Sequence, residues 1–135
     1  MQKGKKINAK ALLPFGDDVY SSRLLSGGEL DGKPVININD GRLAPRQRTE
    51  GAAHEKTEIY YILSCAEGTA TYVGEERIET EAGDVIIIPP NTFHWIDNTQ
   101  SDEIYHILTF WPKQEENGVF HHRQKAWGES FRFTE

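Results

Sequence analysis

The sequence predicts an all-β fold in one domain, and three observations lead to this prediction. The chain has 135 residues, the length of a single ordinary domain. Turn-forming residues recur at short intervals, and short segments rich in β-branched and aromatic side chains lie between them. The helical signal is weak, because only residues 8–13 are expected to form a short turn, which ends before Pro14. Short strands separated in this way are typical of a β-sandwich or barrel.

The first two expected strands lie in the first half of the chain. Residues 35–39 alternate apolar and polar side chains, and we expect this strand to stop at the turn-forming pair Asp40 and Gly41. Residues 59–63 are aliphatic or aromatic throughout, which favours a second strand.

A hairpin and an apolar strand are expected next. Residues 69–73 and 77–80 flank a short stretch that begins with Gly74, and a glycine in this position favours a hairpin turn. Residues 85–88 are all apolar, so we expect a strand that is covered on both faces.

The last two expected strands are residues 93–96 and residues 104–111, of which the second ends before Pro112. Side chains alternate between the two faces of a strand. If His94 points inward, Ile96 does so too, while the residues between and before them point the other way.

Composition narrows the classes of function. Charged residues make up 27% of the chain, and 21 acidic against 15 basic residues give a net charge of −6. An acidic balance argues against nucleic acid or an anionic membrane as a partner. Cys65 is the one cysteine, so no internal disulfide can form. We find no apolar stretch of membrane-spanning length and no signal-peptide pattern, and we expect a cytoplasmic protein.

Two segments carry residues that could bind a metal. His54 and Glu58 would lie roughly 13 Å apart on one extended strand, too far to share an ion. A tight turn at residues 55–57 would bring the two side chains together, and His94 opens a strand after a Pro-Pro-Asn turn. Two imidazoles and a carboxylate suit a divalent transition metal and leave coordination positions free for substrate and oxygen.

Residues 83–98 resemble the second sequence motif of the cupin superfamily. That motif has Gly, Pro, Gly, His and Asn at fixed spacing, and this chain has Gly83, Pro89, Asn91, His94 and Asn98 at the matching positions. Asparagine replaces only the second glycine, and it tolerates a left-handed turn better than most residues.

The first cupin motif is matched with two departures. His54 aligns with its second histidine, and Glu58 with its glutamate and the strand that follows. Ala52 stands in the position of the first histidine, and Cys65 stands where glycine is usual. The resemblance therefore implies His54, Glu58 and His94 as ligands of one divalent transition metal. Iron or manganese is favoured, and zinc or nickel is the alternative.

The resemblance also implies a single cupin-type barrel of the double-stranded β-helix or jelly-roll kind. It spans residues 35–112, which we expect to be the barrel core. Residues 1–34 are expected to pack on the barrel or on a partner, and residues 113–135 are expected to form a C-terminal extension. Because cupins of this kind often pair and the extension holds several aromatic residues, we expect a homodimer.

His106 and Tyr60 are candidates for proton transfer. Alternation places Tyr60, and not Tyr61, on the same face as Glu58. His106 could be a pocket residue that acts as general acid or base, a substitute ligand, or a core histidine held by a neighbour.

Other polar residues of the sequence are expected to have structural or surface roles. Asn98 is expected to hold a turn, and Cys65 to be a buried apolar residue. Arg46 and Arg48 are expected in a solvated loop, with recognition of a substrate carboxylate or phosphate as the alternative. The pair at 121–122, two adjacent histidines, is expected on the surface.

Three functions remain open at this point. The first is a metal-dependent enzyme acting on a small organic molecule, foremost an oxygen-dependent dioxygenase-type reaction, with isomerase, epimerase or lyase chemistry as the alternative. The second is a non-catalytic module that binds a small molecule, such as a sugar, or a metal, and Ala52 favours it. The third is a cupin without metal that serves structure or assembly.

Overall fold

The computed structural model describes residues 4–30 and 32–112. These residues form eleven strands and one short 3-10 turn, which loops connect. No helix in these ranges is long and apolar enough to cross a bilayer. The turn η1 (Ala9–Ala11) lies within the turn expected at residues 8–13, and the Asn8 side chain caps it. The strands are β1 (Phe15–Gly16), β2 (Tyr20–Ser26), β3 (Glu29–Leu30), β4 (Lys33–Pro34), β5 (Asn37–Leu43), β6 (Glu58–Ser64), β7 (Ala70–Val73), β8 (Glu76–Glu79), β9 (Val85–Ile88), β10 (His94–Asp97) and β11 (Tyr105–Trp111).

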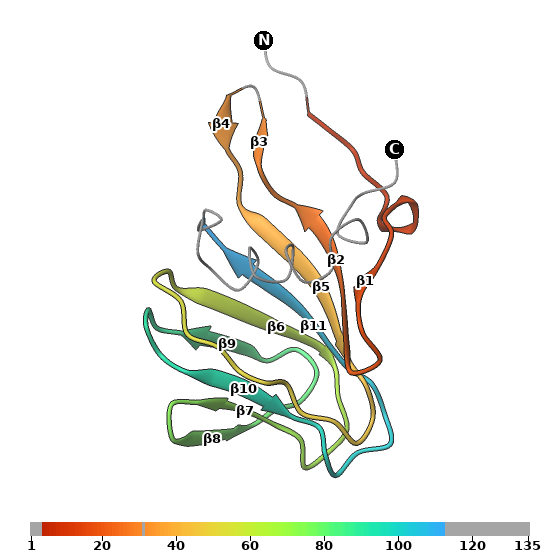
Figure 1. Ribbon diagram of the computed structural model, residues 1–135, viewed down its shortest axis with the longest axis vertical. Coiled ribbons are helices and arrows are strands. Elements are labelled where there is room, and N and C mark those ends of the chain that lie inside the picture. The colour runs from red at the N-terminus through yellow and green to blue at the C-terminus, as the bar shows by residue number, and fades with distance from the viewer. Residues whose placement is uncertain (1–3, 31, 113–135) are drawn as a thin grey trace.

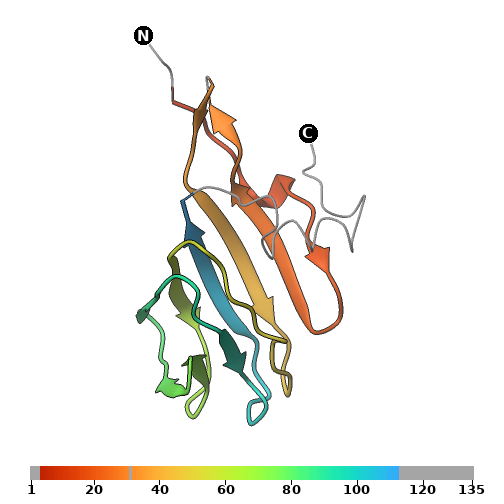
Figure 2. The same cartoon turned by 60° about the vertical axis from the view of Figure 1, so that its left-hand side comes forward.

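The strands form two main sheets, which confirms the all-β prediction (Figure 1). The large sheet has the order β1-β2-β5-β11-β6-β9, and the small sheet has the order β10-β7-β8. A separate two-stranded sheet, β3-β4, lies at the end of the molecule farthest from β7 and β8 (Figure 1). Figure 2 shows the small sheet set against the lower part of the large one.

The core lies between the two sheets and follows strand alternation. In the middle of β6 and along most of β11, alternate side chains are buried, and the apolar ones among them form one core with Ile96 of β10. We call the face of the large sheet that carries them the inner face, and the opposite face the outer face. The buried core consists of Leu43, Tyr60, Ile62, Ile86, Ile88, Ile96, Tyr105 and Ile107.

The strand that begins near residue 35 does not stop at Asp40 and Gly41. That prediction is wrong, because β5 continues to Leu43 and pairs with β11 along its whole length. Gly41 has a packing role here: a Cβ at this position would collide with the ring and hydroxyl of Tyr20. A glycine inside a strand often marks such a close approach, which sequence alone does not distinguish from a turn.

Residues 85–88 form β9 as expected, but only one face of the strand is covered. Ile86 and Ile88 are 7% and 1% exposed, whereas Val85 and Ile87 are 54% and 65% exposed. The prediction of two covered faces is therefore wrong for the single chain. Only the inner face of β9, which lies at the edge of the large sheet, packs on the core.

Sequence reasoning missed the strands that precede residue 35. β2 pairs with β5 through six residue pairs, with one register shift, and so extends the large sheet. Its alternation is carried by Ser22 and Leu24, which are both buried. Because this segment contains three serines, its sequence lacks the alternation of apolar and polar side chains that would indicate a strand.

The Tyr105 hydroxyl is buried and lies within hydrogen-bond distance of the hydroxyls of Thr71 and Thr80, at 3.0 and 2.7 Å. We expect Tyr105→Phe to lower the free energy of unfolding by about 1–2 kcal/mol, because the two threonines lose their shared partner. Urea unfolding measures this change. Tyr61→Phe, at an exposed tyrosine, is the matched control and should change stability by less than about 0.5 kcal/mol.

Burial also raises the pKa of Tyr105 to about 12. A raised pKa in the folded state means that the neutral phenol is favoured by folding. Its stabilising contribution is complete below about pH 10 and is lost as the pH rises toward 12. Unfolding curves across this range should show that loss in the wild type and a smaller loss in Tyr105→Phe. Equal losses in both proteins would contradict this account.

Candidate metal centre

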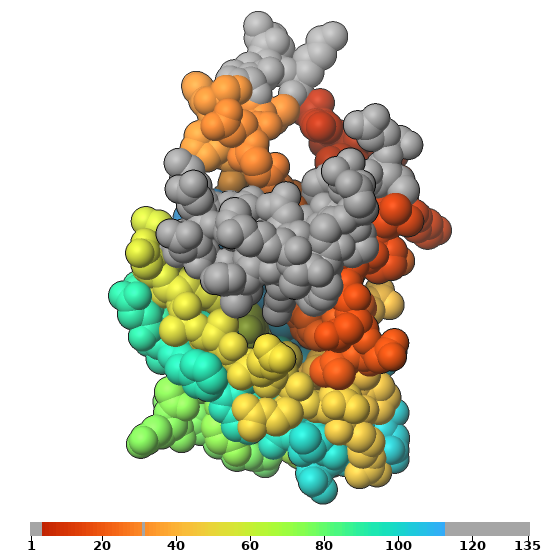
Figure 3. All heavy atoms as spheres, in the orientation of Figure 1, coloured from red at the N-terminus to blue at the C-terminus, as the bar shows by residue number. Residues whose placement is uncertain are grey.

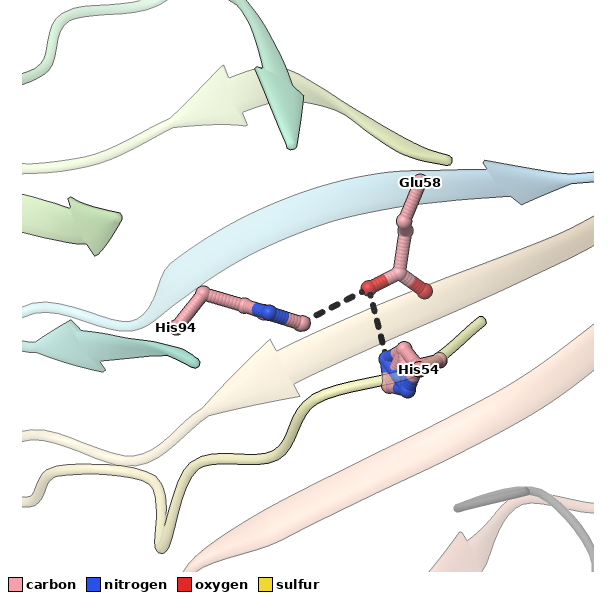
Figure 4. Close-up of side chains that lie close together, drawn as sticks. All are labelled: His54, Glu58 and His94. Atoms are coloured by element: carbon pink, nitrogen blue, oxygen red, sulfur yellow. Dashed lines mark hydrogen bonds and ion pairs between the residues drawn. The ribbon is translucent and has the colours of Figure 1, made fainter. Parts of the chain in front are cut away.

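Two stretches that lie far apart in the sequence, residues 54–58 and the start of β10, bring His54, Glu58 and His94 together. His54 belongs to the loop of residues 44–57, which connects β5 to β6. Glu58 is the first residue of β6 in the large sheet, and His94 is the first residue of β10 in the small sheet. Figure 4 shows the three side chains pointing toward one another. The bend at residues 55–57 that sequence reasoning required is what lets His54 meet Glu58.

The three ligand atoms lie within 4.8 Å of one another. Oε1 of Glu58 is 3.1 Å from Nε2 of His94 and 3.4 Å from Nε2 of His54 (Figure 4). The two imidazole rings meet edge to face, with centroids 4.8 Å apart. His94 is 3% exposed, so this cluster is largely removed from solvent.

The second ring nitrogen of His94 fixes its tautomer. Nδ1 lies 2.9 Å from the carbonyl oxygen of Thr92, which can only accept a hydrogen bond. Nδ1 therefore carries a proton and donates it. In the neutral ring, the lone pair of Nε2 then points toward Glu58, as in histidines that bind metals.

This arrangement fits a cation. In the neutral tautomer, His94 Nε2 and Glu58 Oε1 are both acceptors, so a proton or a metal ion must lie between them. Nitrogen and oxygen ligands bind transition metals at about 2.0–2.2 Å, and two ligands at near-right angles are then about 3 Å apart. The separations of 3.1 and 3.4 Å from the carboxylate match this spacing.

Backbone contacts with β10 hold the loop that carries His54. Thr49 donates its N–H to the carbonyl of Ile96, and its hydroxyl accepts from the N–H of Ile96. Ala52 and His94 exchange two backbone hydrogen bonds. Figure 3 shows this loop, in yellow, on the surface of the molecule next to β10 in teal. Hydrogen bonds to β10, the strand that supplies His94, thus hold the loop that carries His54.

A stack of side chains on the other face of β10 reinforces these contacts. The rings of Trp95 and Tyr72 are parallel, with centroids 4.1 Å apart, and the Arg48 guanidinium lies 3.9 Å from the centroid of Trp95. Cation–π contacts of this kind contribute roughly 0.5–1 kcal/mol at exposed sites. The stack connects the loop to both β10 and β7.

Comparison with known families identifies this architecture. The cupin domain family matches residues 39–111, more than half of the chain and the span that holds all three candidate ligands. The chain belongs to the cupin family. Comparison of this cupin with curated protein sequences found no match.

Solved structures share the cupin fold at low sequence identity. The polyketide cyclase RemF from Streptomyces resistomycificus has a TM-score of 0.67 at 16% identity, covering 83% of this chain and 81% of its own. KdgF from a Halomonas species has a TM-score of 0.65 at 16% identity, covering 85% and 98%. A predicted oxalate decarboxylase from Thermotoga maritima has a TM-score of 0.62 at 16% identity, covering 82% and 100%.

The pairing of Ala52 with His94 shows where the side chain at position 52 points. Residues directly opposite each other in an antiparallel bridge point to the same side, and Ala52 is paired with His94. A histidine at position 52 would therefore point toward the cluster. The methyl group of alanine leaves that side of the cluster without a fourth protein ligand.

The structure places the two tyrosines of β6 as the sequence predicts. Tyr60 is 8% exposed on the inner face, and its ring centroid is 5.9 Å from that of His94. Tyr61 is 39% exposed on the outer face. Tyr60 is thus a neighbour of the candidate metal centre.

The structure does not bring His106 to this cluster. On β11 it alternates with the inward residues Tyr105 and Ile107, so its side chain lies on the outer face. There its Nε2 lies 2.7 Å from Oδ1 of Asp40. Of the readings that the sequence left open, this geometry corresponds to a histidine held by a neighbour.

The other polar residues singled out from the sequence lie away from the three candidate ligands, in turns, loops or partly buried positions. Asn98 is fully buried and donates to the carbonyls of Ala44 and Glu103, which confirms that it holds a turn. Cys65 is only partly buried. Arg46 lies in an exposed loop and forms two hydrogen bonds with Asp102, which lower the pKa of that carboxyl group. The histidines at 121–122 and the aromatic residues near the C-terminus lie outside the described residues.

Sequence reasoning missed the residues that position the ligands. Thr92 acts through its backbone carbonyl, which any residue could provide, so the sequence holds no signal for it. Trp95 and Tyr72 were placed in strands, but nothing in the sequence shows that strands this far apart stack their rings. Gly51 was also overlooked: its φ of 88° and the close approach of the Phe93 ring require glycine there.

Metal content tests the cluster directly. We expect cupin purified anaerobically without chelator to hold close to one divalent transition metal per chain, and His94→Ala to lose it, because one of three ligands is gone. Elemental analysis measures the content. His106→Ala, a histidine on the other face, is the matched control and should keep the metal. Equal metal content in all three proteins would contradict the assignment.

The stack on β10 can be tested separately. We expect Trp95→Ala to weaken metal binding by about 10-fold, because the loop that carries His54 loses its anchor. Competition with a chelator of known affinity measures the change, and circular dichroism checks that the fold is intact. Tyr72→Phe retains the stacked ring and should bind metal like the wild type. Unchanged affinity in Trp95→Ala would show that the backbone contacts suffice.

Proposed function

We propose that this cupin is a metal-dependent enzyme that acts on a small organic molecule in an oxygen-dependent, dioxygenase-type reaction. The observation that carries the proposal is the set of two histidines and one carboxylate, with alanine at the position that faces them. Three protein ligands leave several positions of a six-coordinate metal open. Non-haem iron oxygenases use a ligand set of this type.

The identity of the metal follows from the ligands only in part. Imidazole and carboxylate suit iron, manganese, nickel and zinc, and we propose iron or manganese because the reaction consumes oxygen. When bound, such a metal supplies Lewis-acid polarisation of the substrate and, for iron, electron transfer to dioxygen. The chain itself supplies the ligands and the surroundings of the reacting atoms.

Two features of the surroundings support catalysis in this proposal. The hydrogen bond from His94 to the Thr92 carbonyl makes the imidazole a better ligand and fixes its ring. Tyr60, beside His94, has a phenol that can donate or accept a proton, and we assign it to proton transfer with the bound substrate. We do not assign that role to His106, because it lies on the other face of the sheet.

The second candidate is non-oxidative chemistry at the same centre, such as isomerisation, epimerisation or lyase activity. Two of the similar structures carry names of that kind, a polyketide cyclase and a predicted oxalate decarboxylase. In such a reaction the metal acts only as a Lewis acid, and Tyr60 would move the proton.

Oxygen consumption separates the two candidates. We expect the Fe(II)-loaded protein to consume oxygen with at least one member of a panel of small catechols, diketones and hydroxy acids, and His94→Ala to consume none. An oxygen electrode follows the reaction, and mass spectrometry after labelling with ¹⁸O₂ shows whether both oxygen atoms enter the product.

Three other results would replace the proposal. Product formed without oxygen uptake would establish the Lewis-acid reaction instead. A metal-loaded protein that binds panel members without converting any of them would be a binding module. A protein that takes up no metal would be a structural cupin.

A further inference from the structure

A row of polar side chains crosses the inner face of the large sheet and ends beside the candidate metal centre. Asn39 on β5 is paired with Thr109 on β11, and Thr109 is paired with Tyr60 on β6. Residues directly opposite each other in antiparallel strands point to the same side of the sheet, so all three lie on the inner face. We call Asn39, Thr109 and Tyr60 the polar row. Figure 1 shows the three strands side by side.

The polar row leads away from the metal centre. The Tyr60 ring lies beside His94, with centroids 5.9 Å apart, and Glu58 precedes Tyr60 by two residues on the same face of β6. Neighbouring strands are about 4.8 Å apart, so the backbone of Asn39 lies two strand spacings, about 10 Å, from that of Tyr60. A molecule of about six carbons that binds the metal at one end is therefore long enough to reach Asn39.

The side-chain amide of Asn39 is only half satisfied. Asn39 is 4% exposed, and its Nδ2 donates to the hydroxyl of Ser22 on β2 at 3.2 Å. Its Oδ1 is also buried and has no hydrogen-bond partner among the described residues. Because Nδ2 is turned toward β2, Oδ1 is turned away from β2, which is the side on which β11 lies. A buried acceptor without a donor costs stability, so this oxygen is suited to a donor on a bound molecule.

Two other buried asparagines leave Oδ1 unpaired, but their positions have a structural explanation. Asn98 donates to two backbone carbonyls and Asn37 donates to one. Buried carbonyls need such donors, which explains why asparagine stands at both positions. Asn39 donates only to a serine hydroxyl, which gives the sheet no comparable reason to keep an amide there.

Thr109 adds a second polar group between Asn39 and the metal centre. It is 5% exposed, and its hydroxyl makes no hydrogen bond within the described part of the chain. A threonine hydroxyl can both donate and accept, so it can pair with a polar group of a bound molecule. The side chains of His54 and Glu58 are 14% and 13% exposed, so the metal centre is the more open end of this path.

We propose that the polar row holds the far end of the substrate and that Asn39 determines which substrates bind. This inference rests on the proposed function, because the near end of the molecule binds the metal. The substrate class is an organic molecule of about six carbons that chelates the metal through two oxygens and carries a hydroxyl group at its far end. That hydroxyl donates to Oδ1 of Asn39. A carboxylate in its place would face another acceptor and is rejected.

Binding to the Mn(II)-loaded protein under anaerobic conditions tests this selection without turnover. Three probes share an α-oxo acid group, which chelates the metal, and a six-carbon chain that ends in a hydroxyl, a methyl or a second carboxylate group. The hydroxyl probe should bind about 10-fold more tightly than the methyl probe, because it gains one hydrogen bond to a buried acceptor. The carboxylate probe should bind most weakly. Isothermal titration calorimetry measures the three dissociation constants.

Asn39→Leu removes the acceptor and keeps the size of the side chain. This variant should bind the hydroxyl and methyl probes equally, and its urea midpoint should not fall, because an unpaired buried oxygen is lost with it. An asparagine with a purely structural role would give the opposite pair of results. Ser22→Ala is the matched control: it removes the other hydrogen bond of the same amide and should keep the preference for the hydroxyl probe.

Pyruvate has the same chelating group without a far end, so it separates this inference from the proposed function. If pyruvate binds the metal-loaded protein but the wild type shows no preference for the hydroxyl probe, the role of Asn39 is wrong and the metal centre stands. A preference that persists in Asn39→Leu, or a tighter fit of the carboxylate probe, would also overturn it. If neither pyruvate nor any longer probe binds, the chelated substrate is wrong, and both proposals fall.

Discussion

The Glu58 carboxylate and two imidazole nitrogens converge in a largely buried position, and the rest of the site depends on this convergence. His94 donates its only ring proton to Thr92 when neutral, so its free nitrogen faces a carboxylate oxygen 3.1 Å away. Two acceptors at that distance repel unless a cation lies between them. The contacts around this site hold that arrangement, and a divalent metal is a cation whose ligand spacing it matches.

The rest of the fold can be understood as support for that convergence. The large sheet supplies Glu58, the small sheet supplies His94, and the packing of the two sheets around Ile96 and Ile62 fixes the distance between them. The loop of residues 44–57 is not free, because it runs beside β10 as an irregular strand and the Arg48 stack anchors it from the other side. Ala52 is the residue of this irregular strand that is paired with His94. It keeps the backbone pairing that positions the centre and leaves one side of it open.

Much of the fold and of the candidate site could be predicted from the sequence. Strands with strong alternation, such as β6 and β11, were found within one or two residues, and the spacing of the second motif indicated His94. The failures have physical causes. Asp40 and Gly41 read as a turn, although the glycine is required by the ring of Tyr20 against the strand. The face of His106 follows from alternation, but which face of the sheet is inner depends on tertiary packing. β2 was missed because its buried positions include a serine that bonds to Asn39 across the sheet.

The most direct test of the account is the anomalous diffraction signal of crystals grown from Fe(II)- or Mn(II)-loaded protein. We expect one strong peak between β6 and β10. It should lie about 2.0–2.2 Å from Nε2 of His54, Nε2 of His94 and a carboxylate oxygen of Glu58. The side of the ion that faces Ala52 should hold only solvent or substrate. A peak at any other group of residues, or a fully loaded crystal in which Glu58 does not touch the ion, would contradict it.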